Sequence, residues 1–230
     1  MERCHLRRGS HDVWLTFWAE DRPGPAAAFG VLVGLEEVRL LPRAGPADHP
    51  RDEAETITYV FRGALAQRDS TGRSGVIQAG EFQRITTGRG IRRKESNASR
   101  IDWTHLFRVS FLPAEVGAGP SYEQKRFAAA ERHNVLCVVA SPDGRQGSLR
   151  IHQDAFVYSG ALDPGRHLVH ELRPDRGAWL HVISGEAALQ DVVMTAGDGA
   201  GVTGESSVSL TAREETEILF LDLCPEGRSL

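Results

Sequence analysis

The sequence predicts an all-β protein built from two similar halves in tandem. Short apolar runs recur along all 230 residues, Gly, Pro, Asp and Asn separate them, and sequence typical of helices is scarce. Many short strands at this spacing are typical of a β-sandwich or a β-barrel.

The expected strands follow one another with few interruptions. The apolar runs cover residues 29–41, 55–69, 75–80, 104–112, 135–141, 178–190, 208–212 and 216–223. Residues 121–134 (SYEQKRFAAAERHN) follow Pro120 and combine Ala, Glu, Lys and Arg at a density compatible with a helix. We therefore expect one short helical connection in the middle of the chain.

The two halves resemble each other. TYVFRGALAQRD leads to VIQAGEF and then to THLFRVSFLP, whereas LHVISGEAALQD leads to VMTAGDG and then to TEILFLDLCP. Each half thus has a strand, a Gly turn, a strand, an Ala-Gly-acidic turn and a closing apolar strand, which indicates internal duplication. We place an N-terminal domain at 1–118 and the connecting segment with a C-terminal domain at 119–230.

Composition excludes several classes of protein. No run approaches 18 apolar residues and no signal peptide is recognisable, so we expect neither a membrane protein nor a secreted one. The three cysteines form no CxxC motif, which favours a cytoplasmic location. The formal charge is 27 − 31 = −4, and the only basic cluster is GRGIRRK, so nucleic acid is not the expected partner.

The stretch HPRDEAETITYVFRG, residues 49–63, has the pattern of a metal site with one residue that does not fit. His49 and Arg51 stand two apart before a strand-like run, where alternate side chains share a face. A second His at this position would complete a pair of ligands. A guanidinium is only a donor and stays charged, so Arg51 cannot bind a metal.

Three segments together resemble the pirin family of the cupin superfamily, especially bacterial pirin-like bicupins with quercetinase activity. They are residues 48–97, which contain HPRDEAETITYV and TTGRGIRRKE, then 120–127 (PSYEQKRF), then 141–162 (SPDGRQGSLRIHQDAFVYSGAL). The resemblance implies a bicupin of two jelly-roll-like β-barrels, with a single metal, usually iron, in the first. It also implies that an active member would be a quercetin 2,3-dioxygenase-like oxidoreductase.

The family's ligands are two His in a His-Pro-His pattern, a third His after the GRGI turn, and a Glu two residues further on. These positions correspond here to His49, Arg51, Arg93 and Glu95. Two of the four ligands are therefore replaced by arginine. We expect no metal or other cofactor; a metal, if present, would be iron or another divalent transition metal.

The substitutions leave three hypotheses. In the first, Arg51 or Arg93 pairs with Glu95 in place of the metal, and the site binds a small anionic or phenolic ligand. In the second, a rearranged metal site uses His49, Glu55, Glu95 and His105. In the third, the protein is an interaction module for a protein partner, by analogy with regulatory pirins.

Overall fold

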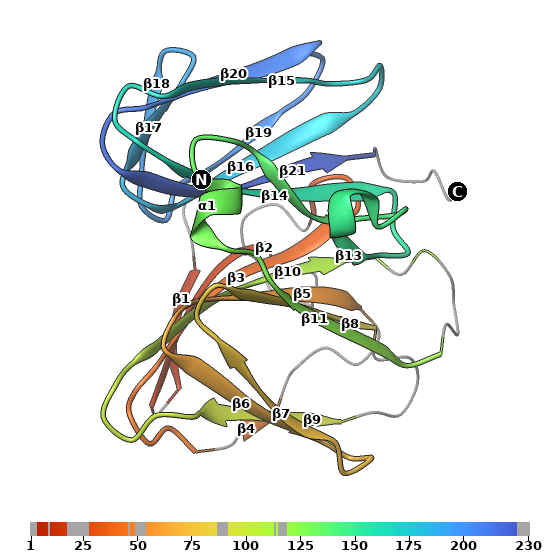
Figure 1. The fold of residues 1–230 in the computed structure, drawn as a ribbon, viewed down its shortest axis with the longest axis vertical. Coiled ribbons are helices and arrows are strands. Elements are labelled where there is room, and N and C mark those ends of the chain that lie inside the picture. The colour runs from red at the N-terminus through yellow and green to blue at the C-terminus, as the bar shows by residue number, and fades with distance from the viewer. Residues whose placement is uncertain are drawn as a thin grey trace. The chain divides into compact units, whose positions relative to one another are not determined.

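The computed structural model describes residues 4–8, 10–17, 28–45, 47–48, 54–86, 92–112, 114 and 119–224 (Figure 1). The chain divides into two compact units. The N-terminal unit extends to Arg126, and the C-terminal unit comprises Phe127 onward together with Phe29–Val31. Within the described residues, no helix has the length and apolar character needed to cross a membrane.

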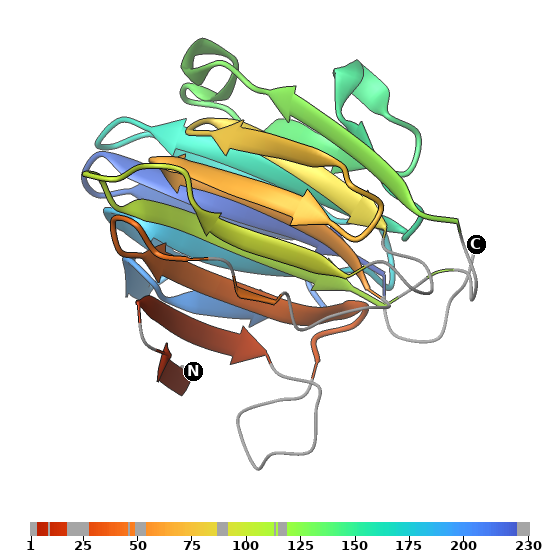
Figure 2. The same cartoon turned by 90° about the horizontal axis from the view of Figure 1, so that it is seen from below.

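The N-terminal unit consists of two antiparallel sheets. The larger has the strand order β1 (Cys4–Arg8), β2 (His11–Phe17), β3 (Leu32–Leu40), β10 (Thr104–Phe111), β5 (Glu55–Arg62), β8 (Glu81–Thr86) and β11 (Ser121–Arg126). The smaller has the order β4 (Ala47–Asp48), β9 (Arg93–Asn97), β6 (Ala64–Asp69) and β7 (Ser74–Gln78). Figure 2 shows the red strands β1 and β2 extending one edge of the larger sheet and the green strand β11 extending the other.

The C-terminal unit repeats this plan. Its larger sheet has the order β13 (Leu149–Arg150), β12 (Cys137–Ser141), β14 (Ala155–Leu162), β21 (Thr216–Leu223), β16 (Gly177–Ser184) and β19 (Gly199–Val202). Its smaller sheet has the order β15 (His167–Glu171), β20 (Ser207–Ala212), β17 (Glu186–Leu189) and β18 (Val192–Thr195). The order β3-β10-β5-β8 therefore matches β14-β21-β16-β19, and β4-β9-β6-β7 matches β15-β20-β17-β18, as the predicted duplication requires.

The duplication extends to individual turn residues. Gly63 and Gly185, which precede β6 and β17, have φ angles of 77° and 82°. A Cβ atom at either glycine would lie 2.4 Å or less from a backbone carbonyl oxygen, so only glycine fits. Thr104 and Thr216 each donate their hydroxyl, at 2.8 Å, to the carbonyl oxygen of the residue that follows the glycine.

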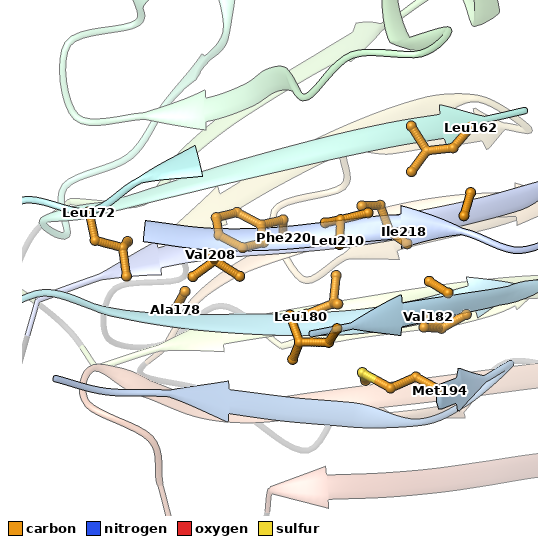
Figure 3. Close-up of a cluster of buried hydrophobic side chains, with 13 residues drawn as sticks. Leu162, Leu172, Ala178, Leu180, Val182, Met194, Val208, Leu210, Ile218 and Phe220 are labelled. Atoms are coloured by element: carbon orange, nitrogen blue, oxygen red, sulfur yellow. The ribbon is translucent and has the colours of Figure 1, made fainter. Parts of the chain in front are cut away.

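Each unit has an apolar cluster between its two sheets, and apolar residues on the other face of its larger sheet are buried as well. In the C-terminal unit this cluster draws on β14, β16 and β21 from one sheet and on β17, β18 and β20 from the other (Figure 3). In the N-terminal unit, one cluster among the described residues consists of Val38, Leu40, Ala44, Val60, Leu65, Ile77 and Leu106. The central strands of the larger sheets are buried on both faces, so their sequences carry apolar residues on both faces and do not alternate strictly between apolar and polar residues.

The prediction of a helix over 121–134 is largely wrong. Only α1 (Ala129–Arg132) is α-helical, and residues 121–126 form strand β11 along β8. The 3₁₀ turn η1 (Arg145–Gly147) follows later in the chain. Gln124 lies opposite Gln83, and the Gln83 Nε2 atom donates to Gln124 Oε1 at 3.2 Å. Pairing with an open sheet edge therefore outweighs the helix propensity of this segment.

Candidate functional site

A cluster of buried charges lies between the two sheets of the N-terminal unit. On β10, Leu106 belongs to the core, so Arg108 two residues later points to the same side. Arg108 donates from Nη1 to Glu36 Oε2 at 3.2 Å and from Nη2 to the carboxylate of Glu95, on the opposite sheet. Arg93 completes the cluster, with its Nε atom 3.1 Å from Glu95 Oε1.

Positive and negative charges alternate in this cluster, in the order Glu36, Arg108, Glu95, Arg93. All four residues are buried, with exposed fractions between 3% and 7%. Burial alone would lower the pKa of Arg108, but the two carboxylates beside it outweigh burial and raise that pKa. For Arg93 the effect of burial prevails over the attraction of Glu95, and its pKa is lowered. Arg93 is therefore the less compensated of the two cations.

The same positions are apolar or aromatic in the C-terminal unit. Matching Thr104 to Thr216 aligns Arg108 with Phe220, and the strand registers then align Glu36 with Tyr158. By the same registers, Glu95 and Arg93 align with two residues of β20. Those residues are Leu210 and Val208, which Figure 3 shows packed near Phe220.

Burying four charges carries a large desolvation cost that apolar residues avoid. The C-terminal unit shows that the fold is complete with apolar side chains at these positions. The charges of the N-terminal unit are therefore not needed to form the fold, which marks the cluster as a candidate functional site.

A cavity of about 360 Å³ adjoins this cluster. It is lined by Gln67, Arg68, Asp69, Arg73, Ser74, Gly75, Ile85, Thr86, Arg93, Pro120, Ser121 and Tyr122. Two lining groups have unused hydrogen-bonding capacity: in the part of the chain that the structure describes, Arg93 Nη1 and Gln67 Oε1 are buried and make no hydrogen bond.

Several other polar groups of the cavity wall have partners of their own. Asp69 Oδ1 accepts hydrogen bonds from the backbone N–H groups of Thr71 and Arg73 at 2.9 and 3.1 Å, which closes the β6–β7 hairpin. The Arg84 Nη1 atom donates to Ser121 Oγ and, at 3.3 Å, to Thr86 Oγ1. Among the buried polar groups of the described wall, Arg93 and Gln67 therefore retain hydrogen-bonding capacity for a ligand, and the exposed Arg68 and Arg73 add positive charge.

The structure brings together only some of the residues singled out in the sequence. The predicted contact between Arg93 and Glu95 is confirmed. His49 and Arg51 lie outside the described residues. Glu55 and His105 are on the other face of the larger sheet, because they alternate with the inward-facing residues of β5 and β10.

On that outer face both residues have their own partners. Glu55 Oε1 accepts a hydrogen bond from Thr86 Oγ1 at 3.1 Å, and the Nε2 atom of His105 donates to Glu37 Oε1 at 2.9 Å. Glu55 and His105 therefore do not meet Glu95 to form the rearranged metal site. No group of three His, Cys, Asp or Glu side chains suited to a metal occurs among the described residues.

Sequence reasoning missed Arg108, Glu36, Gln67 and the cavity itself. A signal for the first two was present, because Arg108 shares the parity of Leu106 and Glu36 shares that of Val38 within apolar runs. A charged residue on the apolar face of a strand is unusual and points to a buried partner.

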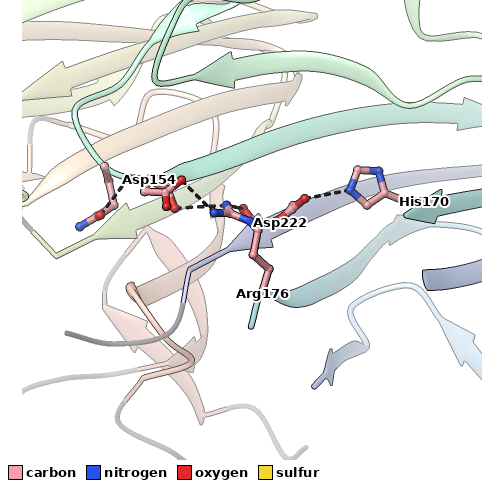
Figure 4. A network of polar contacts seen from close by, with 5 residues as sticks. Asp154, His170, Arg176 and Asp222 are labelled. Atoms are coloured by element: carbon pink, nitrogen blue, oxygen red, sulfur yellow. Dashed lines mark hydrogen bonds and ion pairs between the residues drawn. The ribbon is translucent and has the colours of Figure 1, made fainter. Parts of the chain in front are cut away.

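A second polar network lies in the C-terminal unit (Figure 4). The Arg176 Nη1 atom donates to Asp154 Oδ1 at 2.9 Å, and its Nε atom donates to the carboxylate of Asp222. The His170 Nε2 atom donates to Asp222 Oδ2 at 3.0 Å. Burial alone would raise the pKa of Asp222, but the hydrogen bonds from His170 and Arg176 lower it. These groups satisfy one another, so we interpret the network as structural.

Two family models match the chain. The model described as Pirin covers residues 7–109, and the model described as Quercetinase C-terminal cupin domain covers residues 138–223. The quercetin 2,3-dioxygenase of Escherichia coli K12 is 34% identical over 225 residues, which are 97% of this chain and 96% of the relative. A pirin-like protein of Caulobacter vibrioides is 31% identical and covers 84% of both chains.

Solved structures agree with this similarity. The crystal structure of YhhW from Escherichia coli superposes with a TM-score of 0.91 at 33% identity, over 98% of this chain and 96% of that one. A second structure, of bacterial pirin YhhW in complex with nickel(II), gives a TM-score of 0.90 at 33% identity over 97% and 96%.

The sequence-based expectation that no cofactor is bound is wrong. The nickel(II) complex of YhhW, together with the relatives named quercetin 2,3-dioxygenase, points to a metal cofactor. In this chain, the described ligand positions are Arg93, which cannot donate an electron pair, and Glu95, whose two oxygens contact guanidinium groups. These two residues do not by themselves fit a metal ion, and the other two positions lie outside the described residues.

Proposed function

The chain belongs to the pirin family, and from this premise we propose that it binds a small phenolic molecule in the cavity of its N-terminal unit. Relatives named quercetin 2,3-dioxygenase act, by that name, on a polyphenol. The cavity volume of about 360 Å³ lies in the range of small-molecule sites, about 300–1,000 Å³. Its wall combines the apolar surface of Ile85 and Pro120 with the charge of Arg93.

One observation carries this proposal: the buried charges of the N-terminal unit have apolar counterparts in the C-terminal unit. Such a cluster costs stability, and its last member, Arg93, lines the cavity. A phenolate oxygen is an acceptor that a guanidinium binds well. In this proposal, Arg93 stands where the family has a metal-ligating histidine, and its guanidinium binds the phenolic oxygen.

Flavonol binding tests the proposal. Titration of the purified protein with quercetin, followed by isothermal calorimetry, should show saturable binding to one site per chain. The substitution Ile85→Trp fills the cavity and should weaken binding at least tenfold, because the ligand and the indole compete for the same space. Val193→Trp, on an exposed position of β18, is the matched control.

Equal affinity for quercetin in the wild type and the Ile85→Trp variant would contradict the location. Absence of binding in the wild type would contradict the ligand class.

The nickel(II) complex of YhhW favours a second candidate function, a metal-dependent quercetin 2,3-dioxygenase. Elemental analysis of the purified protein, combined with oxygen uptake in the presence of quercetin with and without added nickel(II), distinguishes the two. A stoichiometric metal and oxygen uptake that a chelator abolishes would establish this second function. Quercetin binding without oxygen uptake in any metal condition would favour the first. The hypothesis of a protein-interaction module stays a prediction.

A further inference from the structure

Two buried groups of the cavity wall have unused hydrogen-bonding capacity, and one is a donor whereas the other is an acceptor. Arg93 is a buried cation whose Nη1 atom makes no hydrogen bond in the described part of the chain. The Gln67 side chain has a buried amide oxygen, Oε1, that accepts none there either. A buried polar group without a partner destabilises the protein, so a ligand that supplies both partners would recover that loss.

The two groups are also close neighbours on one sheet face. Gln67 lies directly opposite Glu95, and Arg93 is two residues from Glu95 on the same strand. Gln67 and Arg93 are therefore diagonal neighbours on adjacent antiparallel strands, whose Cα atoms are about 7–8 Å apart. One ligand with two adjacent polar groups can reach both.

The rest of the cavity wall defines the remaining features of the ligand. Ile85, Pro120 and Tyr122 provide apolar and aromatic surface against which a ring can pack. Arg68 and Arg73 add positive charge, and among the described residues of the wall Asp69 is the acidic one. Burial alone would raise the pKa of Asp69, but its hydrogen bonds with Thr71 and Arg73 lower it, so this carboxylate stays charged and the described part of the wall has a net positive charge.

We infer that the ligand is an aromatic carboxylate with a hydroxyl group beside the carboxylate. The carboxylate accepts hydrogen bonds from Arg93, and the hydroxyl donates one to Gln67. This inference rests on the proposed function, since it places the phenolic hydroxyl of the ligand in the same cavity and adds a carboxylate that quercetin lacks.

Calorimetric titration with three probes tests whether the ligand is a hydroxylated aromatic carboxylate. They are 2-hydroxybenzoate, which has both groups, benzoate, which lacks the hydroxyl, and 2-hydroxybenzamide, which lacks the charge. The wild type should bind 2-hydroxybenzoate most tightly and the amide at least about tenfold more weakly, because the amide forms no charged pair with Arg93. Quercetin is titrated in parallel.

Variants of the protein test separately how Arg93 and Gln67 contribute to ligand binding. Arg93→Met, of similar length, should reduce the affinity for 2-hydroxybenzoate at least about tenfold, and Arg93→Lys should retain part of it. Gln67→Leu should reduce the affinity for 2-hydroxybenzoate about three- to tenfold and leave that for benzoate unchanged. Arg213→Met, in an exposed ion pair with Glu186 of the C-terminal unit, is the control.

Equal affinity for 2-hydroxybenzoate and 2-hydroxybenzamide, or no effect of Arg93→Met, would overturn the inference. If Arg93→Met does not fold, Ile85→Trp takes its place, and undiminished binding of 2-hydroxybenzoate to that variant overturns the inference equally. Binding of quercetin but of none of the carboxylates would overturn the inference and leave the proposed function standing. If neither class of ligand binds, both fail.

Discussion

Glu95 connects the two sheets of the N-terminal unit, because it lies on β9 and contacts Arg108 of β10. Its contact with Arg93 could be predicted, since residues two apart on a strand share a face. The pairing with Arg108 could not, because the sequence does not state which strands of two sheets face each other. Glu55 and His105 were predicted to lie near Glu95 but are on the opposite face of the larger sheet. The sequence of one strand shows which residues share a face, but it does not show which face points toward the other sheet.

Replacing Glu95 tests whether the buried charged cluster stabilises the protein. Glu95→Ala removes the carboxylate that Arg93 and Arg108 share and leaves buried positive charge uncompensated. We expect the free energy of unfolding to fall by about 3 kcal/mol, as measured by urea denaturation. Glu205→Ala, at an exposed position, should change it by less than about 0.5 kcal/mol. A loss at Glu95 as small as that of the control would contradict the buried cluster.

Most of the strands were predicted from the sequence, but which strands pair was not. Apolar runs located β5, β10, β16 and β21, and repeated Gly turns predicted the duplication that the matching strand orders confirm. The edge strand β11 was missed, since YEQKR has good helix propensity and becomes a strand only by pairing with β8. Its local sequence carries no sign of that partner.

The network around β21 predicts a dependence of stability on pH. Because the folded-state pKa of Asp222 lies below its unfolded value, the stabilisation is present at neutral pH and is lost as the pH falls through the folded pKa. We expect Asp222→Asn to destabilise the protein by about 1–2 kcal/mol at pH 7. That difference should shrink below about pH 4, the unfolded value for aspartate.

Thermal unfolding of both proteins between pH 7 and pH 2 measures this difference. Asp191→Asn, at an exposed turn, should match the wild type at every pH. A difference between wild type and Asp222→Asn that stays constant down to pH 2 would contradict the assignment to this carboxylate.

In the whole molecule, comparison of the two units shows which residues the fold requires and which residues occur in the N-terminal unit alone. Both units share strand order and turn geometry, yet one buries Phe220, Leu210 and Val208 where the other buries Arg108, Glu95 and Arg93. The family resemblance predicted the functional site in the N-terminal unit, and this stays a prediction. It could not locate the cavity, whose wall combines residues from 67 to 122 that are distant in sequence.

The most direct test of this account is a crystal structure of the protein with bound quercetin, solved with and without nickel(II). We expect the flavonol between the sheets of the N-terminal unit, with an oxygen against Arg93 and its rings against Ile85 and Tyr122. The C-terminal unit, filled by its apolar core, should bind none. A flavonol bound in the C-terminal unit, or bound in the N-terminal unit away from Arg93, would contradict the central claim.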